Sequence, residues 1–484
     1  MLEGLEISIV ELKQAELFQD FRIDSETFSK LYLETERLLR ERETKKIGDF
    51  AVSVQNFGAY SLCNQIKFLE SGIPFLMTQN VQKNYIEWDN VSHVSGNIHK
   101  ILYKSHCKHN QVLLTMSGAY LGRAAVFNRS IECSSNQAVA KITLPKIGIS
   151  PYYISTFFNS KFGQNQINQL KTVTGQPNIN MSLIKELEIV FLSHSFQTQI
   201  ESLVKQAHTK QEESKRLYQV AENSLLAELG IDESVMKTTD NEVVSNIKSF
   251  AEFEDSWRLD AEYYQPKYEV LEDLLNKFVQ ISIIELVNYP VVSGTTPKAG
   301  DSTFYTDSEN GIPFLRAVDI KENKVTIEDA NYIKREVHNG ILKRTKLLKG
   351  DVLFSIAGTV GRCGIFENEC EANINQACAI LRFDENIVQR LYVILFFNSD
   401  IGQLIIEKYA RQGVQTNLNL EELAKLKIPI LPMYIQKIIT QKIQASFQLK
   451  TESEHLLSLA KRGVELAIEN GEDAAMVLIN TESL

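Results

Sequence analysis

The chain has 484 residues, of which 44% are hydrophobic and 23% charged, and its formal net charge is −10. This length exceeds what one hydrophobic core usually supports, so two or more domains are expected. The apolar runs, such as residues 392–397, are too short to span a bilayer, which argues against a membrane role.

The acidic total hides a strong asymmetry along the chain. Residues 231–276 hold twelve Asp or Glu against four Lys or Arg, and five more acids but no base follow Arg462. The rest of the chain is weakly basic, with clusters at residues 99–108 and 343–349. The net charge alone argues against binding to nucleic acid, but its distribution leaves local binding open.

The cysteines and the N-terminus indicate an ordinary cytoplasmic protein. Six cysteines show no C-x-x-C spacing, and only Cys107 has histidines close by in sequence, so we expect plain thiols and neither a zinc site nor a disulfide framework. The first residues lack the basic start and apolar stretch of a signal peptide.

An internal duplication organises the chain. The sequence G-I-P-F-L at residues 72–76 returns at 311–315, and F-F-N-S at 157–160 returns at 396–399, both displaced by 239 positions. Two more segments repeat at the same displacement: residues 136–138 match 375–377, and residues 176–180 match 415–419. A nearly constant offset over more than a hundred residues predicts two copies of one domain.

Each half predicts the same elements in the same order. A strand at 112–118 (352–358 in the second half) runs through a glycine-rich turn into a strand at 124–127 (364–366), which reads as a hairpin. A short helix begins near Ser150, with Pro151 at its first position, and ends around Asn159. A polar loop, a last strand (187–192; 426–431) and a long helix follow.

The two long helices are expected at residues 196–229 and 435–469, each about 50 Å long at ~1.5 Å per residue. Each carries an apolar stripe interrupted by a polar waist, at residues 208–214 and 448–454. The alternatives are that the helices pack as an antiparallel pair or that each closes its own domain. The apolar positions singled out as candidate partner-docking residues are Ile200, Leu203, Val204, Leu217, Ile439, Ile443, Leu456 and Val464.

The expected fold class is therefore α+β: two repeated mixed α/β domains separated by two long helices that form an antiparallel coiled-coil pair. The expected boundaries are an N-terminal domain at 1–195, a central helix at 196–235, an acidic linker at 236–256, a C-terminal domain at 257–434, and a second helix with its tail at 435–484.

Catalytic motifs are not found. The turns at residues 118–123 and 358–362 lack the lysine of a P-loop, and strands follow them rather than helices. No H-E-x-x-H, G-x-S-x-G or EF-hand pattern occurs. The motifs of an adenine methyltransferase are also absent, so the chain is expected to be non-catalytic and to hold no metal.

Three features of each half suit a nucleic-acid surface: a basic segment before the central strand, an arginine on the hairpin turn, and an amide-rich loop after the short helix. Lys and Arg contact phosphates, and Asn and Gln match the edge of adenine. The candidate DNA-binding residues are Lys104, Lys108, Arg123, Gln176, Asn178, Lys298, Arg316, Lys343, Arg344, Lys346, Arg362, Arg411, Gln415 and Asn417.

Shared amides have a plainer interpretation, since Asn and Gln commonly cap helices or bridge loop backbone. If the halves read different bases, identical residues cannot distinguish the two sites. Base-reading residues are then expected where the halves differ, at 77–103 against 316–342 and at 164–177 against 403–416. Arg316 against Met77 and Arg411 against Thr172 are examples.

The chain resembles the specificity subunits of type I restriction-modification systems. The motifs that carry the resemblance are R-[IL]-D-x-E from Arg22 and from Arg258, S-G-T-T-P-K at 293–298, G-I-P-F-L-R at 311–316, K-G-D-V-L-F-S-x-x-G-x-x-G-R at 349–362, and G-x-Q-T-N-L at 413–418. The first half departs from this pattern, with N-F-G-A-Y-S at residues 56–61 and a turn one residue longer.

The resemblance implies two target-recognition domains, each reading one half of a split, asymmetric site in double-stranded DNA, and helices that set the gap. It further implies docking of two modification subunits, which bring S-adenosylmethionine, and through them of ATP- and Mg-dependent restriction subunits. No cofactor is expected in this chain. The alternatives are a target-recognition subunit of another phage-defence modification system, an enzyme (methyltransferase or nuclease) with an unrecognised site, or a protein-binding scaffold.

Overall fold

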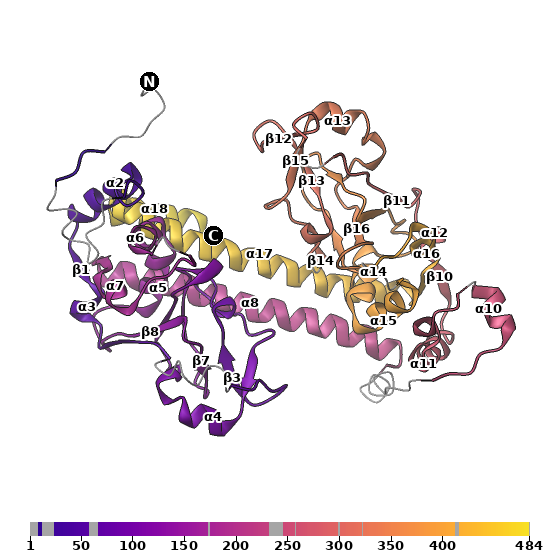
Figure 1. The fold of residues 1–484 in the computed structure, drawn as a ribbon, viewed down its shortest axis with the longest axis horizontal. Helices are drawn as coiled ribbons and strands as arrows, with labels where there is room; N and C mark the ends of the chain where they lie inside the picture. Colours follow the sequence, from indigo (N-terminus) through magenta and orange to yellow (C-terminus); the bar gives the residue numbers. More distant parts are fainter. Residues whose placement is uncertain are drawn as a thin grey trace. The chain divides into compact units, whose positions relative to one another are not determined.

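The computed structural model describes residues 8–11, 24–57, 66–172, 175–231, 245–256, 258–298, 301–321, 323–411 and 416–483. The chain divides into two compact units, Met1–Glu213 with Leu449–Leu484, and Ser214–Gln448. Each unit contains one of the repeated halves together with parts of both long helices (Figure 1). The predicted site residue Gln415, with Cys63 and Arg22, lies outside the described residues.

The two halves share most of their elements in the same order, and the second half has the additional strands β12 and β14. In the first half the strands are β1 (Thr44–Lys46), β2 (Ser53–Gln55), β3 (Ile73–Leu76), β4 (Ser92–Val94), β5 (Val112–Thr115), β6 (Ala124–Val126), β7 (Ser134–Ser135), β8 (Val139–Thr143) and β9 (Glu188–Val190). The helices are α2 (Lys30–Arg40), α3 (Ile47–Phe50), η2 (Thr78–Asn80), α4 (Gly96–Ile101), η3 (Tyr103–Ser105), η4 (Gly118–Tyr120), α5 (Pro151–Asn159), α6 (Lys161–Leu170), α7 (Met181–Glu186) and α8 (His194–Glu228).

In the second half the strands are β10 (Gln280–Ser282), β11 (Val292–Ser293), β12 (Tyr305–Thr306), β13 (Ile312–Leu315), β14 (Asn323–Lys324), β15 (Asn331–Ile333), β16 (Val352–Ser355), β17 (Cys363–Ile365), β18 (Asn373–Ile374), β19 (Cys378–Leu381) and β20 (Lys427–Pro429). The helices are α10 (Phe250–Ser256), η5 (Ala261–Tyr264), α11 (Pro266–Leu275), α12 (Ile283–Leu286), η6 (Ala317–Asp319), α13 (Arg335–Asn339), η7 (Lys343–Thr345), α14 (Arg390–Asn398), α15 (Asp400–Tyr409), α16 (Leu420–Lys425), α17 (Met433–Asn470) and α18 (Glu472–Glu482). The repeated order confirms the duplication.

The central sheets share four strands in the same order, and the sheet of the second unit has a fifth strand, β14, beside β17. The first unit has the strand order β2-β8-β5-β6, and the second has β11-β19-β16-β17-β14. In both, the predicted hairpin is antiparallel, as Leu113↔Ala125 and Leu353↔Gly364 show. A second sheet contains the parallel pair β3 and β7, or β13 and β18. The last strand of each half returns to its first, β9 to β1 and β20 to β10.

The predicted short helix is present, but the polar loop expected after it is wrong. Ser150 accepts the amide of Tyr153 at the start of α5, as its sequence predicts. The chain then turns at once into α6, whose N-cap is Ser160. The tight turn requires Gly163, because a Cβ there would lie 2.4 Å from the carbonyl oxygen of Phe157. Helices α14 and α15 repeat this turn around Gly402.

The long helices complete the core of each unit. In the first unit Leu203 and Val204 of α8 share a core with Leu459 and Val464 of α17. In the second unit the end of α8 and the start of α17 meet in the same way, through Leu225 and Ile439. Both alternatives raised by the sequence therefore hold, since the helices pair and also close the domains.

Helices α8 and α17 run antiparallel, as the order of their contacts shows. In the first unit Ser453 donates to the carbonyl oxygen of Ala207, and Lys210 pairs with Glu452. In the second unit the Ser214 hydroxyl donates to the Ser446 carbonyl oxygen at 2.8 Å. The polar waist is thus a set of satisfied hydrogen bonds within the helix seam.

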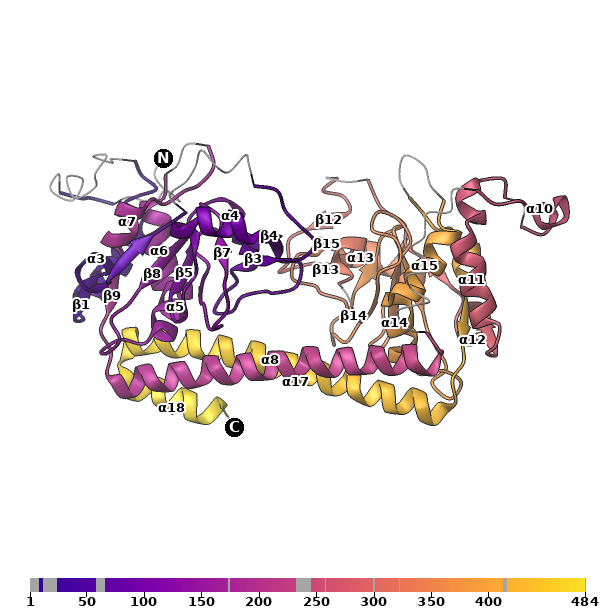
Figure 2. The ribbon, with the colours of Figure 1, turned by 90° about the horizontal axis from the view of Figure 1, so that it is seen from below.

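The helix α18 was not expected. It turns back against the end of α17, where Ala475 and Ile479 join the core of the first unit, so part of the predicted tail is a packed element (Figure 2).

Burial corrects the predicted docking residues. Seven of the eight side chains are at most 6% exposed and face the unit cores, so they are not available to a partner: Ile200, Leu203, Val204, Ile439, Ile443, Leu456 and Val464. The prediction is wrong for these seven because the apolar stripe serves the fold itself. Leu217 is partly exposed and stays a prediction.

Candidate nucleic-acid interface

A basic segment precedes the central hairpin in each unit. In the first unit it follows α4 and exposes Lys104 and Lys108. In the second it follows α13 and exposes Lys343 and Arg344. Each segment also exposes an isoleucine at the same place, Ile101 (56%) or Ile341 (64%), so an apolar side chain stands beside the cations.

Buried histidines fix the helix that leads into each segment. His99 Nδ1 lies 2.8 Å from the Ser134 hydroxyl on β7, and its ring stacks on that of His106 with centroids 3.8 Å apart. In the second unit His338 Nδ1 lies 3.2 Å from the Asn373 amide on β18. Burial lowers the pKa of both His99 and His338.

The base of each segment is held differently in the two units. In the second unit the guanidinium of Arg382 contacts the buried carboxylate of Asp351 at 2.7 Å, and it also donates to the carbonyl oxygen of Lys346. At the equivalent place in the first unit, the amide of Gln111 donates to the hydroxyl of Thr143 at 2.9 Å. The same loop is thus anchored by an ion pair in one copy and by neutral groups in the other.

The glycine-rich turns carry the predicted arginines. Gly118 and Gly122 have φ angles of 77° and 83°, and Gly358 has 82°, which confirms tight turns that favour glycine. The guanidinium of Arg123 lies over the ring of Tyr120 at 4.5 Å and also donates to Gln82. Arg362 is exposed.

The amide loops pack directly on these turns. The amide of Gly118 donates to the carbonyl oxygen of Pro177 at 3.1 Å, and a Cβ at Gly118 would lie 2.8 Å from Nε2 of Gln176. The backbone of Asn178 forms an isolated antiparallel β-bridge with Ser117, and the backbone of Asn417 forms the equivalent bridge with Ala357. The loop and the turn therefore form one surface in each unit.

Two of the repeated amides have purely structural positions. The side chain of Asn180 accepts the amide of Leu183 at the start of α7, and that of Asn419 accepts the amide of Glu422 at the start of α16. The plainer interpretation of the shared amides is correct for these two.

The predicted contact residues form two groups rather than one cluster. Lys104 and Lys108 precede β5, whereas Arg123 and the amide loop lie where β5 ends and the hairpin turns. The second unit repeats this around β16. Four residues of strand place the groups ~13 Å apart along each hairpin.

Ion pairs separate the candidate cations into two classes. Arg316 pairs with the buried Asp319 at 3.1 Å, Arg411 pairs with Glu422 at 2.9 Å, and Lys346 donates to Asn339. Of the candidate cations, six are exposed and make no ion pair or side-chain hydrogen bond with a described residue: Lys104, Lys108, Lys298, Lys343, Arg344 and Arg362.

Sequence reasoning missed an asparagine clamp in each unit. Asn159 donates to the side chain of Asn84 at 3.0 Å and brackets the backbone of Ala124 on β6. Asn398 and Asn323 repeat the arrangement at 2.9 Å. Asn84 and Asn323 both have a φ of 69°. The repeated F-F-N-S motif was a signal for the first member of each pair only.

Helix α8 reaches both clamps, each within its own unit. His208 Nε2 lies 2.6 Å from the carbonyl oxygen of Asn84 in the first unit. The hydroxyl of Tyr218 donates to the side chain of Asn323 at 3.0 Å in the second. The clamps therefore tie the central hairpins to the long helix.

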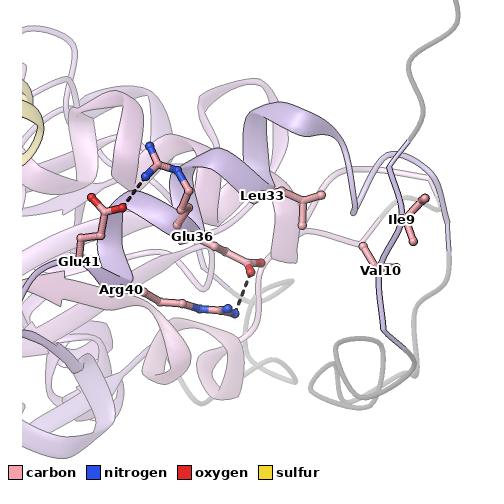
Figure 3. Close-up of a pocket in the computed structure, with 7 residues that line it drawn as sticks. Ile9, Val10, Leu33, Glu36, Arg40 and Glu41 are labelled. Atoms are coloured by element: carbon pink, nitrogen blue, oxygen red, sulfur yellow. Dashed lines mark hydrogen bonds and ion pairs between the residues drawn. The ribbon is translucent and has the colours of Figure 1, made fainter.

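A pocket beside α2 offers no catalytic constellation. It is lined by Ile9, Val10, Leu33 and charged residues of one helix face, among which Arg40 pairs with Glu36 at 3.2 Å (Figure 3). Among the residues that the structure describes, no cluster of His, Cys, Asp or Glu suits a metal ion. No described helix is long and apolar enough to cross a membrane.

Part of the chain is similar to proteins of a known family. The family model of the type I restriction modification DNA specificity domain matches residues 277–459. The type I restriction enzyme EcoBI specificity subunit of Escherichia coli is 26% identical over 141 residues, which are 29% of this chain and 30% of that subunit's length. Residues 277–459 of the chain are therefore similar to type I restriction modification DNA specificity domains.

Two solved structures are similar over most of the chain. The S subunit from M. genitalium is 11% identical, covers 88% of this chain and 95% of its own, and has a TM-score of 0.45. The HsdS subunit from Thermoanaerobacter tengcongensis is 14% identical, covers 89% and 97%, and has a TM-score of 0.27. The matched residues 277–459 contain the candidate residues of the second half from Lys298 to Asn417, and the first half relates to them through the repeat.

Proposed function

We propose that this chain is the DNA-recognition subunit of a type I restriction-modification complex. Each repeated domain would read one half of a bipartite, asymmetric site in double-stranded DNA. The observation that carries the proposal is the repeated placement of unpaired cations before the central hairpin, beside exposed isoleucines, in a chain whose second half is a specificity domain.

Two kinds of side chain in each domain suit different parts of DNA. Lys104, Lys343 and Arg344 are exposed point charges that match phosphates, whose neutralisation dominates affinity. The exposed isoleucines and the amides Gln176 and Asn417 match base edges, including the thymine methyl group. Positions that differ between the halves, such as Tyr103 against Lys343, are the proposed source of different half-site specificity.

The partners follow from the same proposal. Two modification subunits would supply S-adenosylmethionine and methylate adenine, and restriction subunits would supply ATP- and Mg-dependent cleavage, all in the cytoplasm. This chain would hold no cofactor. The helix surface proposed for docking is the exposed apolar pair Tyr434 (67%) and Ile438 (49%), which are four residues apart on one face of α17.

Methylome sequencing of a host that expresses this chain with its modification subunit tests the proposal. We expect one bipartite methylation motif with a fixed gap, and exchange of residues 277–430 for those of another specificity subunit should change one half-site only. A continuous palindromic motif, or no motif, would contradict the proposal.

Two other functions give different outcomes. A subunit of another phage-defence modification system would bind DNA in a gel-shift assay but mark it with a different chemistry. An enzyme would methylate or cleave DNA as the purified chain alone. We expect DNA binding without either reaction.

A further inference from the structure

Two cysteines and a lysine form a buried cluster in the first domain, beneath the basic segment that exposes Lys104 and Lys108. Cys107 is 6% exposed, Cys133 1% and Lys141 1%. The Lys141 ammonium donates to the hydroxyl of Ser135 at 3.0 Å. Both thiols belong to a hydrophobic core with Leu113, so the lysine is the unusual member.

The backbone places the two cysteines directly opposite each other. The amide of Cys107 donates to the carbonyl oxygen of Cys133 at 2.9 Å, next to the antiparallel bridge between His106 and Ser134. Directly opposed, hydrogen-bonded residues have Cα atoms about 5.5 Å apart. That separation falls within the range of about 4.4–6.8 Å that a disulfide bond requires.

The second domain has the same backbone arrangement without the chemistry. Its equivalent amide, that of Leu347, donates to the carbonyl oxygen of Ala372 at 3.1 Å. The position of Lys141 opposite Leu113 is taken by Ile380 opposite Leu353. The fold is therefore satisfied by Leu, Ala and Ile, and the Cys-Cys-Lys set is not needed for packing.

The electrostatics of the cluster make the two thiols unequal. The hydrogen bond from the Cys133 thiol lowers the pKa of Cys107, to which the charge of Lys141 adds, and the same bond raises the pKa of Cys133. Burial lowers the pKa of Lys141 to about 8, although the charges of both cysteine sulfurs act in the opposite direction and raise it. Cys107 is thus the more acidic of the two thiols, and it gives the thiolate more readily than its neighbour.

We propose that Cys107 and Cys133 are a redox-reactive pair that forms a disulfide with a hydroperoxide, with Lys141 as the positioning residue of the Cys107 thiolate. The thiolate attacks the peroxide oxygen to give the sulfenic acid and an alcohol or water. The Cys133 sulfur then attacks the Cys107 sulfur and expels water. Two thiols and one hydroperoxide yield one disulfide, one alcohol or water, and one water.

The test uses the full chain, reduced, treated with hydrogen peroxide and then alkylated. Trypsin cleaves after Lys104, Lys108, Arg129 and Lys141, so the two cysteines fall in separate peptides. Mass spectrometry without reduction should show these peptides joined, two mass units below their sum. The exposed Cys370 reports that oxidant was sufficient.

Three variants keep the test decisive, and two of them carry residues with which the second domain folds. C133A, which copies Ala372, should abolish the linked peptide and leave Cys107 as the sulfenic or a higher acid. K141I, which copies Ile380, should slow both the linkage and alkylation of Cys107 at least tenfold, and K141R should restore both rates. Full oxidation of Cys370 without the linked peptide would overturn the proposal, and an unchanged rate in K141I would remove the lysine from it. Neither result depends on DNA binding.

Discussion

Individual cations in this protein have two different uses, and their acidic neighbours decide between them. Arg316 and Arg411 are engaged by Asp319 and Glu422, so a phosphate would have to compete with a carboxylate already in place. Lys343 and Arg344 have no such partner among the described residues. Arg316 and Arg411 would have to give up these carboxylates to bind a phosphate, and this exchange costs free energy. Lys343 and Arg344 are therefore the better candidates for phosphate contacts.

The double variant K343A/R344A should weaken DNA binding and reduce its salt dependence. If each side chain contacts one phosphate, the slope of log K against log salt should fall by about 0.9 for each charge removed. Fluorescence anisotropy with a cognate duplex at several salt concentrations measures this slope.

R411A is the matched control, since the charge that it removes is already paired with Glu422. Its slope should stay within about 0.5 of the unsubstituted chain. Equal losses in the control and in the double variant would show that local ion pairing does not select the contacts.

Three buried histidines give the stability a pH dependence of known sign. Burial lowers the pKa of His99, His208 and His338 below their ordinary value. The unfolded chain therefore binds more protons than the folded chain once the pH falls below about 6.5. Their contribution is fully present above that pH and is lost as the pH falls toward the folded pKa values.

Urea unfolding at pH 7.5 and pH 5.5 should show a lower free energy of unfolding at the lower pH. The variant H208Q should lose less stability between these two values than the unsubstituted chain, because it lacks one of the three groups. A pH dependence unchanged by H208Q would mean that His208 does not contribute.

At the scale of elements, the turn between two helices is the most constrained feature of each repeat. A Cβ at Gly402 would lie 2.1 Å from the carbonyl oxygen of Phe396 and 2.5 Å from the Cα of Phe397. These are backbone atoms, which cannot rotate away. The identical glycines at 163 and 402 are therefore a consequence of how closely the helices approach.

G402A should destabilise the second unit by about 2 kcal/mol or more, which is typical of overpacking against fixed atoms. G96A is the control, because a Cβ there meets no atom within 4 Å and its helix gains a better helix former, worth up to about 1 kcal/mol. Chemical denaturation followed by circular dichroism compares them, and equal midpoints would contradict the argument.

The helix α6 shows why its sequence was interpreted as a loop. It is rich in Gln and Asn, yet three of these amides are tied to distant backbone atoms. Gln164 donates to the carbonyl oxygen of Gly122, Gln166 to that of Glu188, and Gln169 to that of Thr27. A polar run predicts solvent exposure when its partners are unknown, and these partners lie elsewhere in the chain.

At the scale of the whole molecule, the register of the antiparallel helices α8 and α17 allows one heptad to be removed from each helix so that the removed residues are partners of one another. Residues 209–215 of α8 contain Lys210 and Ser214, and residues 446–452 of α17 contain their partners Glu452 and Ser446. Removal of both heptads takes out each polar contact with its partner and leaves His208 and Tyr218, which hold the clamps.

This double deletion should shorten the gap of the recognised DNA site while both half-sites stay unchanged. Seven helical residues correspond to ~10 Å, or about three base pairs. Methylome sequencing measures the new gap. Altered half-sites would contradict the spacer role, and deletion of one heptad alone should abolish modification because it leaves Ser214 or Ser446 unpaired in the seam.

The sequence by itself determined the duplication, the hairpins and the short and long helices, because repeats, periodicity and capping residues are properties of nearby positions. It also indicated that Asn180 and Asn419 could serve as caps. Only the tertiary structure decided which cations are free, which apolar side chains are buried, and that Cys107 faces Cys133. Each of these depends on a partner that the fold brings from a distant part of the chain, and neither composition nor spacing encodes that partner locally.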